Sequence, residues 1–88
     1  MHTTTVTMKD GSKIKGVIWK WRPILGYFDL AGVAGQEENV RLRFDDVQSA
    51  VTEGERISMG KIGDCDEMAR AREYLKNAKE FGWTEKED

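Results

Sequence analysis

The sequence has very few of the residues from which catalytic and metal centres are usually built. Its 88 residues include one cysteine, Cys65, and one histidine, His2. One cysteine cannot form an internal disulfide or a cysteine-built zinc site, so a reducing cytoplasm is the expected environment. One histidine leaves little material for general acid–base chemistry or for a metal cluster. We therefore expect a protein that is not an enzyme and that has no catalytic residues, no cofactor and no metal.

Long apolar runs and a strong excess of one charge are also missing. No segment approaches the roughly 18 apolar residues of a membrane span, and the first residues, MHTTTVTM, lack the apolar core of a signal sequence. The 14 basic and 16 acidic residues give a net charge of −2, which is too mild for a polyacidic DNA mimic or a strongly basic nucleic-acid coat. The composition favours a soluble cytoplasmic protein without membrane contact.

The chain offers no point at which it would divide into domains. It has one proline, Pro23, and no internal repeat or low-complexity tract that would mark a linker. We therefore expect residues 1–88 to form a single domain. At this length folding buries only about 60–65% of the surface of the unfolded chain, so we expect modest stability.

The N-terminal segment predicts a β-hairpin of defined register. Residues 3–8 alternate along an extended chain and are rich in β-branched side chains. A two-residue turn would place Val6 opposite Lys15 and mix apolar with charged side chains on one face. A three-residue loop with Gly11 in the left-handed conformation instead places Val6 opposite Ile14, so we predict the longer loop.

A long second strand and several shorter strands are expected to follow. The second strand is predicted over residues 13–21, where Gly16 marks a sharp bend or the close approach of another backbone. The remaining extended segments are predicted at residues 26–30, 39–44, 47–52 and 56–59.

The C-terminal third changes to the periodicity of one amphipathic helix over residues 64–81. Asp64 is predicted to be its N-cap, with Glu67 completing a capping box. Gly82 predicts a Schellman end, at which the next residue folds back toward the helix. Residues 84–88 are expected to form a solvated tail. The apolar positions that recur at helical spacing are Met68, Ala71, Tyr74, Leu75, Ala78 and Phe81.

The order of these elements resembles that of the SH3-like and Sm-like small β-barrels. One matching stretch is residues 6–16 (VTMKDGSKIKG), a hairpin that leads into a long bent strand. The other is residues 43–51 (RFDDVQSAV), a short turn between two strands. The resemblance implies a mainly β domain of the α+β class. Residues 3–59 would form a five- or six-stranded antiparallel barrel, followed by one C-terminal α-helix.

A second resemblance concerns the C-terminal half. The segment SAVTEGER, the helix EMARAR and the terminal FGW together resemble small accessory proteins of bacteriophages. That resemblance implies a protein made in the cytoplasm of a bacterial host, where such proteins block or redirect host systems. Anti-CRISPR and other anti-defence proteins have this size. The implied partner is a host protein or a nucleoprotein complex.

Basic and aromatic residues are expected on the outer surface of the sheet. Alternation places on one face of the second strand Lys13, Lys15, Val17, Trp19 and Trp21. Such a face can neutralise phosphates and stack on bases, or it can form the hot spot of a protein interface. The predicted partner-binding residues are Lys13, Lys15, Trp21, Arg22, Arg41 and Arg43.

The tryptophans and acidic residues also have structural interpretations. The apolar side of the helix needs something to cover, so we expect Trp19 to pack under Leu75 and Phe81. Trp21, at a strand end, is the better candidate for exposure. The acidic pairs are interpreted as turns and helix caps. Cys65 is expected in the first helical turn, and its acidic neighbours argue against a role as a nucleophile.

The sequence is consistent with three functions. The leading one is a non-enzymatic, phage-encoded binding protein that inhibits or redirects a host protein or nucleoprotein complex, such as a CRISPR-type defence system. The second is a nucleic-acid-binding module or regulator of the Sm-like or SH3-like kind. The third is a homo-oligomer that sequesters a small signalling nucleotide. If the polar strand at residues 3–7 lies at an edge of the sheet, it can pair with a second copy and build an oligomer.

Overall fold

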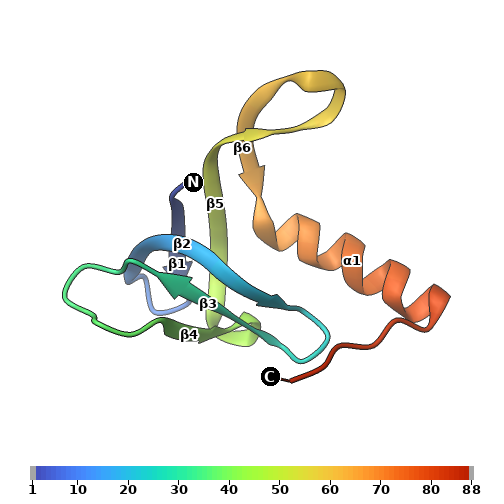
Figure 1. Cartoon of the computed structure of the whole chain (residues 1–88), viewed down its shortest axis with the longest axis horizontal. Helices are drawn as coiled ribbons and strands as arrows, with labels where there is room; N and C mark the ends of the chain where they lie inside the picture. Colours follow the sequence, from blue (N-terminus) through green and yellow to red (C-terminus); the bar gives the residue numbers. More distant parts are fainter. Residues whose placement is uncertain (1, 88) are drawn as a thin grey trace.

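A single curved sheet and one helix make up the computed structural model, which describes residues 2–87 (Figure 1). The elements are β1 (Thr4–Met8), β2 (Lys13–Arg22), β3 (Tyr27–Ala31), β4 (Val40–Arg43), η1 (Phe44–Asp46), β5 (Val47–Arg56), η2 (Ser58–Gly60), β6 (Ile62–Asp66) and α1 (Glu67–Phe81). Neighbouring strands are antiparallel and lie in the order β4-β3-β2-β1-β5-β6. The predicted fold class, a mainly β domain with a C-terminal helix, is confirmed.

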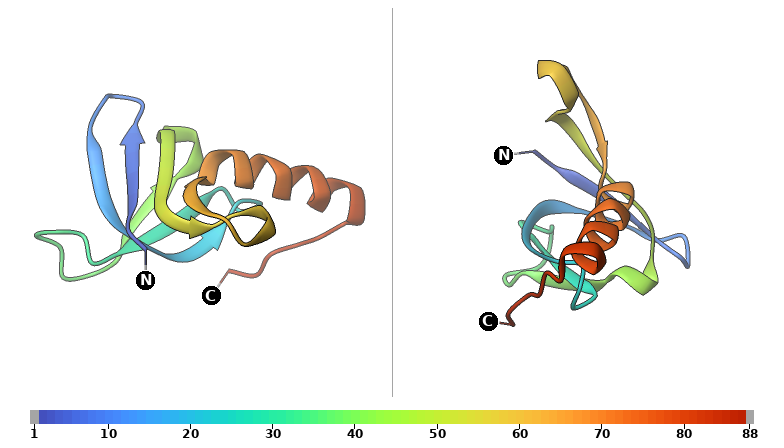
Figure 2. Two further views of the ribbon diagram at one scale, coloured as in Figure 1. Left: turned by 90° about the horizontal axis from the view of Figure 1, so that it is seen from above. Right: turned by 90° about the vertical axis from the view of Figure 1, so that its right-hand side faces the viewer.

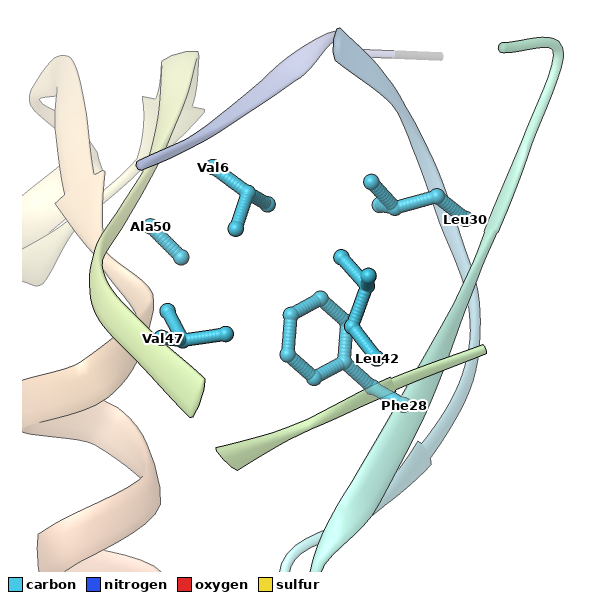
Figure 3. Packing of buried hydrophobic residues seen from close by; sticks show 6 residues of the cluster. All are labelled: Val6, Phe28, Leu30, Leu42, Val47 and Ala50. Atoms are coloured by element: carbon cyan, nitrogen blue, oxygen red, sulfur yellow. The ribbon is translucent and has the colours of Figure 1, made fainter. Parts of the chain in front are cut away.

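The sheet does not close into a complete barrel. β4 and β6 are its two edges, and no ladder joins them within the described residues. The sheet instead curls around a core whose side chains point toward one another from β1, β3, β4 and β5 (Figure 3). The six fully packed members are Val6, Phe28, Leu30, Leu42, Val47 and Ala50.

The β1–β2 hairpin has the predicted register. Val6 lies opposite Ile14, and Thr4 lies opposite Gly16. Gly11 adopts the predicted left-handed conformation, with a φ of 91°. The hairpin therefore has the three-residue loop and not the two-residue turn, and apolar side chains stay together on one face.

Gly16 lies where β2 passes from β1 to β3. It is paired with Thr4 of β1, and from Val17 onward β2 pairs with β3. A Cβ atom at position 16 would lie 2.8 Å from the backbone oxygen of Ala31 and 3.1 Å from the side chain of Leu30. Only glycine fits such an approach, so the prediction of a close backbone contact at this position is confirmed.

A β-bulge at Trp19 changes which side chains of β2 face the core. The residues on either side of it, Ile18 and Lys20, pair with consecutive positions of β3, so Trp19 is an extra residue in the ladder. The extra residue reverses the alternation of side chains. Trp21 therefore packs against the core, whereas Trp19 is 66% exposed.

Both tryptophan predictions are consequently wrong. Trp19 does not pack under Leu75 and Phe81, because all three side chains are exposed. Trp21, which was the candidate for exposure, is half-buried and contacts the ring of Phe28. Strict alternation fails here because the bulge places Trp21 on the apolar side of the sheet.

The segment between β5 and the helix also differs from the prediction. β5 continues through Gly54, which has a φ of 69° at an irregularity in the pairing with β6, and ends at Arg56. Residues 56–59 are therefore not a sixth strand. The sixth strand is Ile62–Asp66, which forms a hairpin with the end of β5. A left-handed glycine has allowed an irregularity within the strand instead of ending it.

The helix begins later than predicted. Its N-cap is Asp66, not Asp64, and the Asp66 carboxylate accepts two backbone N–H groups of the first turn at 3.1 Å each. Asp64 and Cys65 belong to β6, because Cys65 and Asp66 pair with β5. The β5–β6 pairing is therefore formed in place of the predicted capping box, and Glu67 is the first helical residue.

The predicted Schellman end of the helix is confirmed. Gly82 has a φ of 71°, and the N–H of Trp83 donates to the carbonyl of Ala78 at 3.0 Å. The Trp83 ring lies against Tyr74 and Phe81, with centroid separations of 5.5 and 5.8 Å. The following residues run back toward the β2–β3 turn, and all of them except the half-buried Glu85 are exposed within residues 84–87 (Figure 2).

Replacing Gly16 with alanine tests the close approach. Gly16→Ala places a methyl group against the backbone oxygen of Ala31, so we expect a loss of about 1–3 kcal/mol in the free energy of unfolding, measured by urea denaturation. The matched control is Gly63→Ala in β6, where the nearest atom is the flexible end of Ile57 at 3.2 Å. We expect less than half the loss there. Equal losses at the two positions would contradict this account of the bend.

Candidate functional site

The predicted contact residues do not form one face. Lys13 and Lys15 are exposed on the part of β2 that pairs with β1, before the bend. Trp21 lies on the core side of the sheet. The bend and the bulge in β2 separate the predicted contact residues, so the six do not lie on one surface.

Three of the predicted cations do come together, and we call them the basic sheet face (Arg22, Arg41 and Arg43). Arg22 and Arg43 flank Tyr27 in one row across the sheet. Arg41 lies opposite Asp29 in the next row, and its Nε donates to that carboxylate at 3.0 Å. The Arg41 guanidinium also lies 3.9 Å from the centre of the Tyr27 ring. These contacts hold Arg41 in place, so the face is a preorganised surface.

Trp21 links the sheet to the helix. Its ring contacts Phe28 and Phe44, with centroid separations of 5.8 and 5.1 Å. The guanidinium of Arg70, near the start of α1, lies 4.4 Å from the centre of a Trp21 ring. A cation–π contact at a partly exposed site contributes about 0.5–1 kcal/mol. Trp21 therefore packs within the molecule, between the core and the helix.

A buried carboxylate, Glu67, lies at the first position of the helix. It is 3% exposed, and it accepts the Nη2 of Arg70 and the Sγ of Cys65 at 2.8 Å each. Because burying a charge is costly unless it is paired, the Arg70 contact offsets the cost of burying Glu67 at the start of the helix. The sequence predicts Glu67 only as a capping residue. Its spacing of three residues from Arg70 is the signal that identifies the ion pair.

A cavity of about 300 Å³, lined by both polar and apolar side chains, opens beside the Glu67–Arg70 pair. Its volume is at the lower end of the range for small-molecule sites, which begins at about 300 Å³. The hydroxyls of Thr4 and Thr52 in its wall hydrogen-bond to each other. The polar side chains around it are therefore largely occupied with one another, which favours a role in fixing the helix on the sheet.

Cys65 lies in β6 and not in the first helical turn, where it was expected. Burial, and then the hydrogen bond to the Glu67 carboxylate, raise the pKa of its thiol to about 11. The helix N-terminus would have acted in the opposite direction. The thiol is therefore protonated at neutral pH, which is the unreactive form.

The hairpin tip (residues 56–62) projects away from the rest of the sheet (Figure 1). Three apolar side chains are exposed on it: Ile57 at 42%, Met59 at 96% and Ile62 at 64%. Its charged residues, Arg56 and Lys61, are basic and exposed, and the sequence RISMGKI contains no acidic residue. The tip therefore combines apolar side chains with positive charge.

Met59 adopts a backbone conformation that suits few residues. Its φ is 58° and its ψ 32°, and Gly60 follows with a φ of 76°. Two consecutive positive φ values define the hairpin turn in which Asn-Gly is preferred. Among residues 2–87, Met59 is the one non-glycine residue with a positive φ. Such a residue costs about 1–2 kcal/mol, and an almost fully exposed side chain recovers little of this cost through packing.

The sequence pattern does not predict the hairpin tip. Residues 56–59 are predicted as an extended strand, and Met-Gly is not among the dipeptides that mark hairpin turns. The usable signal is the pair Gly60 and Gly63 around one basic and one apolar residue, which is typical of a loop.

Comparison of the chain with protein-family models, curated proteins and solved structures found no match in any of the three. Within residues 2–87 the helix is too short and too polar to cross a membrane. In the same part of the chain, no three His, Cys, Asp or Glu side chains gather in a way that could hold a metal ion.

The pH dependence of Cys65 alkylation tests the placement of its thiol. Because only the thiolate reacts, we expect the rate of reaction with iodoacetamide to rise up to a pH of about 11. Glu67→Gln removes a charged acceptor of the S–H, so we expect the apparent pKa to move down toward the ordinary value of 9.0. The control is Glu73→Gln at an exposed helix position, which leaves the profile unchanged. A native rate that levels off near pH 9 would contradict the placement.

Proposed function

We propose that this chain is a non-enzymatic binding protein that occludes a site on a partner protein, and that the hairpin tip makes the central contact. The observation that carries the proposal is Met59, an apolar side chain that is 96% exposed on a left-handed backbone. Neither property helps the free chain to fold. Strained residues that the fold does not need are typical of functional sites.

The chemistry of the hairpin tip indicates the kind of partner. Burial of Ile57, Met59 and Ile62 would contribute about 1.5–3 kcal/mol each, before the costs of association. Arg56 and Lys61 add positive charge at the edge of this apolar group. The complementary surface is an apolar pocket bordered by aspartates and glutamates.

The setting that we propose follows from the bacteriophage resemblance. The partner is a host protein or nucleoprotein complex, such as a CRISPR-type defence system, and the chain acts by covering part of its surface. A small domain with a projecting tip suits this task, because the curved sheet holds the tip away from the remaining surface (Figure 1).

Replacing Met59 with asparagine separates the needs of folding from those of binding. Asparagine tolerates the left-handed conformation, so Met59→Asn is expected to raise the free energy of unfolding by about 0.5–1 kcal/mol, measured by urea denaturation. The control, Met59→Ala, removes the side chain but keeps the strain, and it should give a smaller change. A clear loss of stability in Met59→Asn would show that the methionine is part of the folded packing, and the proposal would fail.

Site-specific photo-cross-linking in a bacterial lysate tests the contact itself. A photoreactive residue in place of Ser58, at the hairpin tip, is expected to give one dominant protein adduct. The same residue in place of Gln36, on the exposed loop between β3 and β4, should not. An excess of unlabelled wild-type chain should suppress the adduct, and an excess of Met59→Asn should suppress it at least about tenfold less effectively. Equal suppression by the two competitors would rule out the hairpin tip as the contact.

A further inference from the structure

The C-terminal tail (residues 83–87) returns across the molecule to the basic sheet face. One carboxylate oxygen of Glu85 accepts the backbone N–H of Leu25 at 3.0 Å, in the β2–β3 turn. The Nε of Arg22 donates to the backbone carbonyl of Lys86 at 3.3 Å. The tail was expected to be solvated, but it makes both side-chain and main-chain contacts with this region.

Aromatic contacts anchor the beginning of the tail. The ring of Trp83 packs against Tyr74 and Phe81 at the end of α1. Burial, and then the neighbouring carboxylate of Glu85, raise the pKa of the Tyr74 hydroxyl. Glu85 therefore lies between the helix and the β2–β3 turn.

The fit of the tail on this face is incomplete. The carboxylate of Glu87 reaches only to 4.0 Å from the Nη1 of Arg41, and both side chains are well exposed. Among the described residues, the hydroxyl of Tyr27 and the second carboxylate oxygen of Glu85 are buried without a hydrogen-bond partner. A buried polar atom without a partner is destabilising, so the Tyr27 hydroxyl leaves this face with capacity for a contact that the tail does not make.

We propose that the basic sheet face, together with the backbone N–H of Leu25, is a binding site for an acidic, extended peptide segment of a partner protein. The chain's own tail occupies the site in its absence and competes with it. This site is separate from the hairpin tip, because the tip and the tail lie at opposite ends of the molecule in Figure 1 and in the right-hand view of Figure 2.

The observed contacts favour a peptide over a nucleic acid. A carboxylate on a backbone N–H and a main-chain carbonyl on an arginine are the pairings that an extended acidic peptide offers. Asp29 already pairs with Arg41 at 3.0 Å, which reduces the positive charge available to successive phosphates. The hydroxyl of Tyr27 provides a further donor for a carboxylate or a carbonyl.

Competition by the tail lowers the apparent affinity of the site for an external ligand. A segment attached through a few residues has an effective concentration in the millimolar range. An external acidic peptide must displace it, so the site is weak in the intact chain and becomes stronger when the tail is released. Loss of the two tail carboxylates should therefore increase the apparent affinity for an external acidic peptide by about tenfold.

The test uses heteronuclear NMR of the full chain, with the backbone amide of Leu25 as the reporter. The double variant Glu85→Gln/Glu87→Gln is expected to shift this amide signal, because the carboxylate acceptor is lost. Addition of the synthetic peptide Thr-Glu-Lys-Glu should return the signal toward its wild-type position, with about tenfold higher apparent affinity than for the wild-type chain. The same peptide with glutamine in place of both glutamates should not.

Site variants and a second probe complete the test. Arg22→Gln and Arg41→Gln, each in the double-variant background, should weaken peptide binding while the core amide of Phe28 stays in its folded position. Arg72→Gln, at an exposed helix position, is the matched control and should not change binding. An unshifted Leu25 amide in the double variant would overturn the proposal. Equal binding of the glutamine peptide would do the same, as would a response only to a single-stranded thymidine oligonucleotide.

Discussion

The extra residue that Trp19 adds to β2 is the constraint on which the arrangement of the molecule depends. Before it, alternate side chains such as Ile18 face the core, and after it the inward position belongs to Trp21. Trp21 thereby reaches the phenylalanines of the core and contacts Arg70, whose other contact is the buried Glu67. The sheet, its core and the start of the helix are therefore connected through one indole, and the arginines of β2 and β4 remain outside.

The parts of the fold that depend on local geometry could be predicted from the sequence. Gly11, Gly16 and Gly82 each occupy a place where a positive φ or a close backbone contact excludes other residues. Alternation alone could not predict the bulge at Trp19, because the inward placement of Trp21 accompanies packing against Phe44 and Arg70, which come later in the chain. The start of the helix at Asp66 was equally inaccessible, since it depends on whether the ladder with β5 or the capping box is more stable.

The same difference between local geometry and distant contacts explains why the basic sheet face could be predicted in part and the hairpin tip could not. Strand alternation correctly places Arg41 and Arg43 on the outside of the sheet, and the register adds Arg22 to them. The contacts of Arg22 and Arg41 with the tail depend on the path of the chain after the helix, which alternation does not describe. The hairpin tip was missed because Met59 occupies a turn position that favours asparagine or glycine. Where a residue conflicts with the local backbone preference, we expect that function, and not folding, selected the amino acid at that position.

We infer that the hairpin tip, and not the basic sheet face, makes the first contact with the partner protein. Hydrogen–deuterium exchange of the full chain, alone and in complex with the protein that it captures, tests this claim most directly. The account predicts slower amide exchange at residues 56–62 in the complex, where a short exposed turn should exchange rapidly in the free chain. Protection confined to β3 and β4, with exchange at residues 56–62 unchanged, would contradict it.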